Sequence, residues 1–149
     1  MPFHPQTKVR IDAPVSTVWR TLLDIGAYPE WNHEVRFHAP PAFGRRVPMT
    51  VRLFGRTLTV EVLILAVEPG RELRWRGGTW GLMTGTHYFK LEPEGDAVTL
   101  VTHGERFAGL GTPLLWPFLA RELHAFYNRI NVALKSRCET QHVIAAEPA

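Results

Sequence analysis

One long amphipathic helix, placed after a run of strands, is the feature that most constrains this chain. From about residue 113 towards residue 137, apolar residues recur at intervals of three and four, which is the period of a helix with one buried face. The residues on that face are Leu115, Leu119, Leu123, Phe126, Ile130 and Leu134. Most of the preceding sequence is strand-like, so this helix has to cover one face of a whole sheet. We therefore expect an α+β fold.

Seven segments before this helix have the apolar pattern of β-strands. They cover residues 7–11, 33–38, 47–54, 56–67, 72–76, 80–91 and 97–107. Turn-forming residues separate the later ones, and the tightest connections are Gly55, Glu68-Pro69-Gly70, Gly77-Gly78 and the segment 92–96. Short connections of this kind join antiparallel neighbours.

Two short helical segments are expected between the first two strands. Residues 13–27 form an amphipathic stretch that Gly26 ends. The following segment, Tyr28-Pro29-Glu30-Trp31, has the length of one helical turn, which would fold Trp31 back. We interpret Trp31 as a plug that closes one end of a hollow sheet.

Length and composition set the outer limits. At 149 residues the chain has the size of one ordinary domain, and we expect a single domain over residues 1–149, with 140–149 as a frayed tail. The longest apolar run, residues 62–67, is too short to cross a bilayer, so we expect no stable membrane insertion. The N-terminal residues lack the apolar core of a signal peptide. The single cysteine, Cys138, fits a reducing compartment, and we expect a cytoplasmic protein.

The charge pattern argues against a nucleic-acid partner. The net charge of +3 is modest, and its densest patch, Arg45-Arg46 with Arg52 and Arg56, reads as the solvent face of alternating strands. The sequence has no zinc-finger, phosphate-loop or dinucleotide glycine pattern. We therefore expect no nucleic acid, no metal and no cofactor, and the sequence leaves the oligomeric state open.

Alternation along the last two strands indicates which residues face inward. Lys90 belongs outside, which places its two neighbours inside. The expected inward residues are His87, Phe89, Leu91, Thr99, Val101, His103, Glu105 and Phe107. A register that pairs Thr99 with Leu91 would put His87 opposite His103.

The same rule is less decisive for the middle strands. We expect Val67, Leu73 and Trp75 to face inward, on the same side as Leu65, Leu63 and Glu61. Glu61 is either an outward residue in a bulged strand or a buried carboxylate inside the sheet. An unpaired buried carboxylate would be costly, so the sequence leaves both possibilities open.

One helix cannot fill the concave face of seven strands, so we expect a cavity between them. Its walls would be apolar and its polar lining sparse. The expected ligand-binding residues are Trp75, His87, Phe89, Val101, His103, Glu105, Leu119, Leu123 and Phe126.

Several spaced motifs carry a family resemblance. They are "APVSTVWRTLLDIGAYPEWN", "TVEVLILAVEPGRELRW", "HYFKLEP", "VTLVTHGERFAGL" and "INVALKSRCE". Over roughly residues 5–139 the chain resembles the polyketide cyclase/dehydrase and lipid-transport superfamily, which includes the START domains and the birch-pollen-allergen family. The resemblance implies a helix-grip fold, in which a seven-stranded antiparallel sheet curves around the C-terminal helix and two short helices close one end. Its members act on very different molecules, so it does not select a function.

Three polar residues are candidates for chemistry. His87, His103 and Glu105 share the inner face, where two imidazoles and a carboxylate could hold a metal ion, run acid/base chemistry or, most commonly, form a satisfied hydrogen-bond network. The favoured hypothesis is binding or carriage of a small hydrophobic or amphipathic molecule. The alternatives are a cyclase or dehydratase acting on a polyketide-like or aromatic substrate, and a protein-interaction module. Whether the chain is an enzyme stays open, with binding preferred over catalysis.

Overall fold

The computed structural model describes residues 3–146. Its strands are β1 (Gln6–Ile11), β2 (Val35–Phe37), β3 (Arg46–Leu53), β4 (Arg56–Glu68), β5 (Glu72–Thr79), β6 (Met83–Pro93) and β7 (Thr99–Ala108). Its helices are α1 (Val15–Leu23), α2 (Tyr28–Trp31) and α3 (Thr112–Ala146), and a 3₁₀ turn (Ile25–Ala27) joins the first two.

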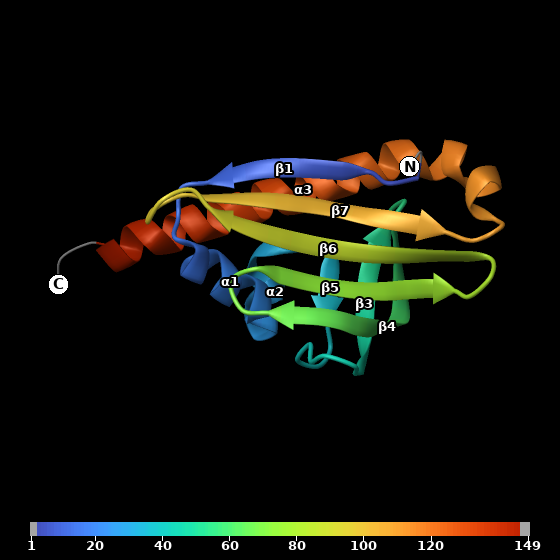
Figure 1. The fold of residues 1–149 in the computed structure, drawn as a ribbon, viewed down its shortest axis with the longest axis horizontal. Coiled ribbons are helices and arrows are strands. Elements are labelled where there is room, and N and C mark those ends of the chain that lie inside the picture. The colour runs from blue at the N-terminus through green and yellow to red at the C-terminus, as the bar shows by residue number, and fades with distance from the viewer. Residues whose placement is uncertain (1–2, 147–149) are drawn as a thin grey trace.

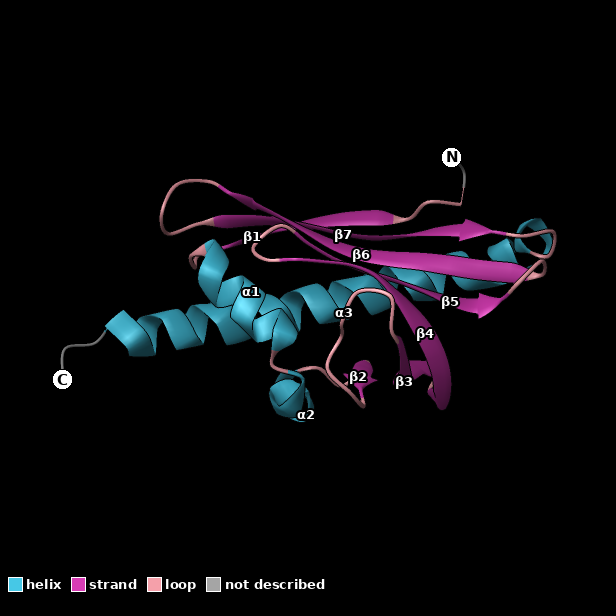
Figure 2. Cartoon of the chain, turned by 60° about the horizontal axis from the view of Figure 1, so that its bottom comes forward, coloured by secondary structure: helices cyan, strands magenta, loops and turns pink. Residues whose placement is uncertain are grey.

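The strands of the described chain form one antiparallel sheet in the order β1-β7-β6-β5-β4-β3-β2. Figure 1 shows α3 running along this sheet, and the rotated view in Figure 2 places it under the concave side. Helices α1 and α2 lie between β1 and β2 in the sequence and pack beside α3. The predicted helix-grip fold, an α+β sheet curved around a C-terminal helix, is confirmed.

Helix α3 turns one face towards the sheet, mainly from Leu123 to Cys138. Its buried residues are Thr112, Leu123, Phe126, Tyr127, Ile130, Asn131, Leu134 and Cys138. Leu115, by contrast, is 37% exposed, so the apolar stripe leaves the core in the first turns, near Pro117. The helix continues to Ala146, so the tail expected to fray from Thr140 is helical up to that residue. Residues 147–149 of that expected tail lie outside the described part.

Helix α2 turns Trp31 back into the core. The side chain of Trp31 is 7% exposed and packs edge-on against Tyr28, with ring centroids 4.9 Å apart. Tyr28 in turn donates a hydrogen bond of 2.6 Å to the carbonyl oxygen of Leu22, which ties α2 to α1. The aromatic pair therefore fills the end of the fold where the two short helices meet, as the sequence predicted for Trp31.

The turn between β5 and β6 lies later than predicted. Gly77 and Gly78 belong to β5, and the turn is instead closed by the Leu82 amide, which donates to the carbonyl of Thr79 at 3.2 Å. Close backbone approach explains the glycine: a Cβ on Gly78 would lie 2.4 Å from the carbonyl oxygen of Met83. Gly78 therefore allows β5 and β6 to pack closely and does not form the turn.

A β-bulge in β4 changes the predicted inward face. Ile64 pairs with Trp75 and Ala66 pairs with Arg74, so Leu65 is an extra residue without a partner on β5. An extra residue reverses the alternation on one side of the bulge. Positions before Leu65 therefore point to the side opposite from the expected one.

Glu61 is the residue most affected by this reversal. Val62 is buried, whereas Glu61, Leu63 and Leu65, which were expected to face inward, face outward. The side chain of Glu61 is 59% exposed and lies 3.7 Å from Arg46 in an ion pair. The cavity therefore contains no Glu61 carboxylate, and of the two possibilities left open for Glu61 the outward residue in a bulged strand is the observed one. The inward orientation expected for Leu63 and Leu65 was wrong.

Candidate functional site

Strands β6 and β7 pair in a register two residues away from the predicted one. Leu91 pairs with Val101, not with Thr99. The hairpin loop is closed by the Glu94 amide, which donates to the carbonyl of Val98 at 2.8 Å. Because side chains alternate along a strand, a shift of two residues keeps every side chain on its predicted face.

The corrected register changes which residues lie opposite each other. His87 lies opposite Glu105, and Phe89 lies opposite His103. The predicted direct opposition of His87 and His103 was therefore wrong, although both residues face inward. They are diagonal neighbours, which long side chains can still bridge.

The two histidines form a buried hydrogen bond. His87 Nε2 lies 2.7 Å from His103 Nε2, and the two side chains belong to residues that are 4% and 0% exposed. An aromatic ring stacks on the face of each imidazole. The ring centroids of Trp75 and His87 are 4.3 Å apart, and those of Phe89 and His103 are 4.1 Å apart. The pair is thus rigidly held rather than free to rotate.

A chain of hydrogen bonds fixes the tautomer of His103. The Thr7 hydroxyl donates to the carbonyl of His103 at 2.9 Å and accepts from Asn131 Nδ2 at 2.8 Å. This orients Asn131 so that its Oδ1, which can only accept, lies 2.7 Å from His103 Nδ1. His103 therefore has its proton on Nδ1 and accepts at Nε2, and His87 must donate from its own Nε2.

The other ring nitrogen of His87 faces Glu105. His87 Nδ1 lies 3.5 Å from Glu105 Oε2. That oxygen also accepts a hydrogen bond of 2.6 Å from the Tyr127 hydroxyl. Glu105 therefore lies between His87 and Tyr127 at the wall of the cavity.

Burial determines the charge states around this pair. Desolvation, with the nearby His87 second, lowers the pKa of His103 well below its ordinary value, so His103 is neutral. Desolvation and the neighbouring Glu105 carboxylate raise the pKa of Tyr127, so its hydroxyl stays protonated and donates. These two neutral groups leave His87 and Glu105 as the polar groups that face the cavity.

A cavity of about 220 Å³ opens beside Glu105, between the sheet and α3. Its lining residues are Val35, Met49, Val51, Leu53, Leu58, Val60, Val62, Trp75, Gly77, Gly78, Met83, Gly85, His87, Glu105, Phe107, Leu123 and Phe126. His87 and Glu105 are the titratable side chains in this set. The walls are otherwise apolar, as the sequence predicted for a cavity in this place.

The structure brings five of the nine expected ligand-binding residues to this cavity. They are Trp75, His87, Glu105, Leu123 and Phe126. Phe89 borders a much smaller void next to α2 instead. His103 and Val101 lie buried behind the lining, and Leu119 packs against the core at its edge.

Strand β3 supplies lining residues that were absent from the sequence-based set. Met49, Val51 and Leu53 alternate with polar residues, so their inward orientation could have been read from the sequence. Leu58 and Val60 of β4 also line the cavity while being 53% and 36% exposed, which places the mouth beside them. All five residues are apolar, and the predicted site was built around the polar candidates of β6 and β7, so these five were left out of it.

Gly85 makes room for the Glu105 carboxylate. A Cβ on Gly85 would lie 2.0 Å from Glu105 Oε1, so no side chain fits there while Glu105 keeps its position. The same Cβ would lie 3.1 Å from the ring of Phe107, which closes the space from another side. The glycine is thus part of the site, although no sequence signal singled it out.

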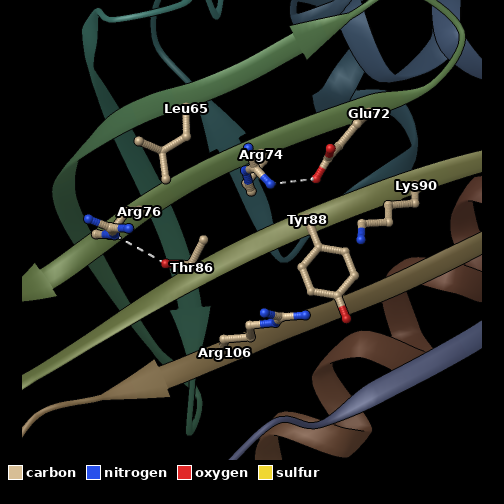
Figure 3. Close-up of a pocket in the computed structure, with 8 residues that line it drawn as sticks. All are labelled: Leu65, Glu72, Arg74, Arg76, Thr86, Tyr88, Lys90 and Arg106. Carbon is tan, nitrogen blue, oxygen red and sulfur yellow. Dashed lines mark hydrogen bonds and ion pairs between the residues drawn. The ribbon is translucent and has the colours of Figure 1, made fainter.

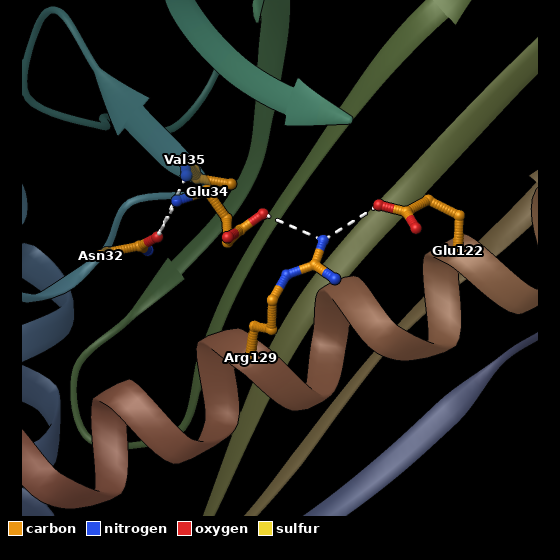
Figure 4. Close-up of polar contacts among 5 residues, drawn as sticks. All are labelled: Asn32, Glu34, Val35, Glu122 and Arg129. Atoms are coloured by element: carbon orange, nitrogen blue, oxygen red, sulfur yellow. Dashed lines mark hydrogen bonds and ion pairs between the residues drawn. The ribbon is translucent and has the colours of Figure 1, made fainter. Parts of the chain in front are cut away.

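Polar contacts close the side of the fold between β2 and α3 (Figure 4). Arg129 of α3 donates to Glu34 at 3.2 Å and to Glu122 at 3.0 Å. Asn32 accepts hydrogen bonds of 3.0 Å from the amides of Glu34 and Val35, which holds the start of β2 in place. The edge strand is therefore joined to the helix that covers the cavity.

Metal-binding groups and membrane-spanning helices are both absent from the described residues. Between residues 3 and 146, no three His, Cys, Asp or Glu side chains are grouped so that they could hold a metal ion. Within the same range, no helix is both long enough and apolar enough to span a bilayer.

The curved sheet, the gripping C-terminal helix and the apolar cavity between them define a helix-grip protein. The chain belongs to the polyketide cyclase/dehydrase and lipid transport family, whose model matches residues 3–139. This confirms the resemblance inferred from the sequence motifs. Among curated proteins, no relative matches this sequence.

Solved structures share the fold at low sequence identity. A START superfamily protein from Mycobacterium smegmatis superposes with a TM-score of 0.74 at 17% identity, covering 93% of this chain and 98% of that chain. The Zhui aromatase/cyclase from Streptomyces sp. R1128 gives 0.78 at 16% identity, covering 97% and 98%. The di-domain aromatase/cyclase BexL gives 0.70 at 20% identity, covering 98% of this chain and 51% of that chain. At these identities the likeness establishes the fold alone.

Proposed function

We propose that this protein binds a small hydrophobic or amphipathic molecule in the cavity beneath α3. The observation that carries the proposal is a cavity of about 220 Å³ with apolar walls and two titratable groups, His87 and Glu105, at one side. This arrangement suits a ligand with an apolar body and one polar end. Family membership supports the same class of ligand.

The cavity volume limits what can be buried. A dry apolar cavity of roughly 150 Å³ accommodates benzene, whereas pockets for drug-sized ligands start at roughly 300 Å³. At about 220 Å³ the cavity has room for one ring or a short acyl segment. A longer ligand would extend through the mouth beside Leu58 and Val60, which are partly exposed apolar side chains.

A cavity-filling variant tests this proposal. Val51 lines the cavity, and Val51→Trp would occupy the space, whereas Val132→Trp places the same side chain on α3 at a position that is 68% exposed. We expect N-phenyl-1-naphthylamine fluorescence titrations to show at least a tenfold loss of affinity for Val51→Trp and no change for Val132→Trp. Native mass spectrometry of the purified protein would identify a co-purifying ligand. A protein that carries no small molecule and binds no probe would overturn the proposal and favour an interaction module.

The geometry of the polar groups favours a second candidate function. His87 and Glu105 face the cavity with His87 Nδ1 3.5 Å from Glu105 Oε2, and Tyr127 donates to the carboxylate, so an imidazole and a carboxylate are both in reach of a bound molecule for general acid/base catalysis. A cyclase or dehydratase acting on a polyketide-like or aromatic substrate would use such a pair. In that case Glu105→Gln should keep probe binding within twofold and reduce turnover by about two to four orders of magnitude. As a carrier, the same variant would change only the orientation or affinity of the ligand.

A further inference from the structure

The outer face of the sheet, opposite the cavity, has a hollow of its own. Its volume is about 430 Å³, and Figure 3 shows its residues on neighbouring strands. They are Leu65, Glu72, Arg74, Arg76, Thr86, Tyr88, Lys90 and Arg106. Because alternate residues of β6 and β7 face opposite sides, this hollow and the cavity are built on the same strands but are separated by the sheet.

The hollow is strongly cationic. Four basic side chains line it against one carboxylate, Glu72, which lies 3.2 Å from Arg74 in an ion pair. Lys90, Arg76 and Arg106 make no ion pair with any residue from 3 to 146. Within the described chain, these three cations therefore remain uncompensated in one concavity.

The cations are arranged around a hydroxyl group. Arg76 pairs with Thr86 across β5 and β6, and Thr86 pairs with Arg106 across β6 and β7, so the three residues form one row. Arg76 Nε donates to the Thr86 hydroxyl at 3.1 Å, which orients the guanidinium and leaves its terminal nitrogens free for another acceptor. Neighbouring strands are about 4.8 Å apart, so both arginines can reach one group placed above Thr86.

The buried ring of Tyr88 forms the bottom of the hollow and is held in place by its neighbours. It is 3% exposed, and its hydroxyl is held by Gln6 Nε2 and by His4 Nε2, each at 2.7 Å. The ring lies over Gly104, where a Cβ would approach the Tyr88 hydroxyl to 2.6 Å. Lys90 Nζ lies 5.2 Å from the centre of the same ring, so the lysine is held close to the hollow. The hydroxyl and the ring of Tyr88 are thus both held by contacts to other residues.

We propose that this outer hollow binds a phosphate-bearing molecule. Arginine presents several fixed donors that match phosphate oxygens, and lysine adds a point charge, so these residues favour a phosphoryl group over a singly charged carboxylate. The site faces away from the cavity and does not depend on the function proposed for it. The phosphate could belong to a soluble phosphorylated molecule or to a phospholipid headgroup, because the chemistry of recognition is shared.

Inorganic pyrophosphate is the probe for the test, in isothermal titration calorimetry at low ionic strength. The site variant is Arg76→Gln/Arg106→Gln, and the control is Arg20→Gln/Arg45→Gln, which removes the same charge from exposed positions outside the hollow. We expect at least a tenfold loss of pyrophosphate affinity in the site variant and less than a twofold loss in the control. Backbone amide shifts on titration should concentrate at Thr86 and its strand neighbours.

A second arm separates the two sources of phosphate. The wild-type protein and both variants are sedimented with phosphatidylcholine vesicles with and without phosphatidylglycerol. Co-sedimentation with the anionic vesicles that is lost only in the site variant supports the headgroup, and pyrophosphate binding without vesicle binding supports a soluble ligand. If the wild-type protein binds neither probe, or if both variants lose affinity equally, the proposal is overturned.

Discussion

His87 and His103 are diagonal neighbours across β6 and β7, and their Nε2 atoms lie 2.7 Å apart. This single contact connects a fixed hydrogen-bond chain, which ends at Asn131 and Thr7, with the Glu105 carboxylate at the cavity. Donors and acceptors are fixed from Thr7 to His87 Nε2, and the chain continues to a carboxylate that faces the cavity.

The first prediction concerns the tautomers of the two histidines. Near neutral pH, His103 should be a neutral ring protonated at Nδ1, because Asn131 Oδ1 accepts there. Histidine ring ¹⁵N chemical shifts and long-range ¹H–¹⁵N correlations distinguish the two neutral forms. A His103 ring protonated at Nε2 would contradict the assigned direction of the chain.

The second prediction concerns Asn131, which joins α3 to β1 and β7. Asn131→Leu should lower the free energy of unfolding by about 1–3 kcal/mol, because it leaves the buried Nδ1–H of His103 without an acceptor. Asn128→Leu makes the same chemical change on the exposed side of α3 and should alter stability by less than about 0.5 kcal/mol. Urea unfolding of both variants provides the comparison. Equal effects at the two positions would show that the buried network adds nothing to stability.

Alternation was the part of the structure that the sequence could predict well. His87, Phe89, His103 and Glu105 all face inward as expected, because the side-chain period of a strand does not depend on its partner. The register, however, depends on where the hairpin loop begins and ends. The composition of the segment 92–96 is compatible with two registers of β6 and β7 that differ by two residues. The observed loop, closed by the hydrogen bond from the Glu94 amide to the Val98 carbonyl, decides between them.

The bulge at Leu65 shows a different limit. Every residue from Glu61 to Val67 except Glu61 is apolar, so the hydrophobic pattern contains no signal for an extra residue. The sequence consequently could not decide which face Glu61 occupies, and Leu63 and Leu65 were assigned to the wrong one. The glycine at 85 was missed for a related reason, since its role depends on a carboxylate from another strand.

The third prediction concerns stability at acid pH. The ordinary pKa of histidine is 6.5, and burial lowers the pKa of His103 well below it in the folded state. Below about pH 6.5 the unfolded chain therefore binds a proton at His103 that the folded chain does not. This contribution to stability is fully present above about pH 6.5 and is lost as the pH falls, by at most about 1.4 kcal/mol per pH unit.

Urea unfolding between about pH 7 and pH 5 measures this loss. His103→Leu should reduce the slope by up to one proton, whereas Asn128→Leu, at an exposed position on α3, should leave it unchanged. If His103→Leu does not fold, the ring resonances of wild-type His103 should still stay constant over the same range. A His103 that titrates near pH 6.5 in the folded protein would contradict the assignment.

The fourth prediction concerns Gly85 and Glu105, which share one space at the edge of the cavity. Gly85→Ala should destabilise the protein by about 1–3 kcal/mol, because the added methyl would lie 2.0 Å from Glu105 Oε1 and the carboxylate would have to leave its contact with Tyr127. Combining it with Glu105→Ala removes the obstructing oxygen, so the double variant should be more stable than the sum of the single effects by at least about 1 kcal/mol. Gly26→Ala is the control, since its Cβ would meet only Asp24 Oδ1 at 3.8 Å. Additive effects in the double-mutant cycle would mean that Glu105 does not occupy the space beside Gly85, and the position assigned to its carboxylate at the cavity would then be wrong.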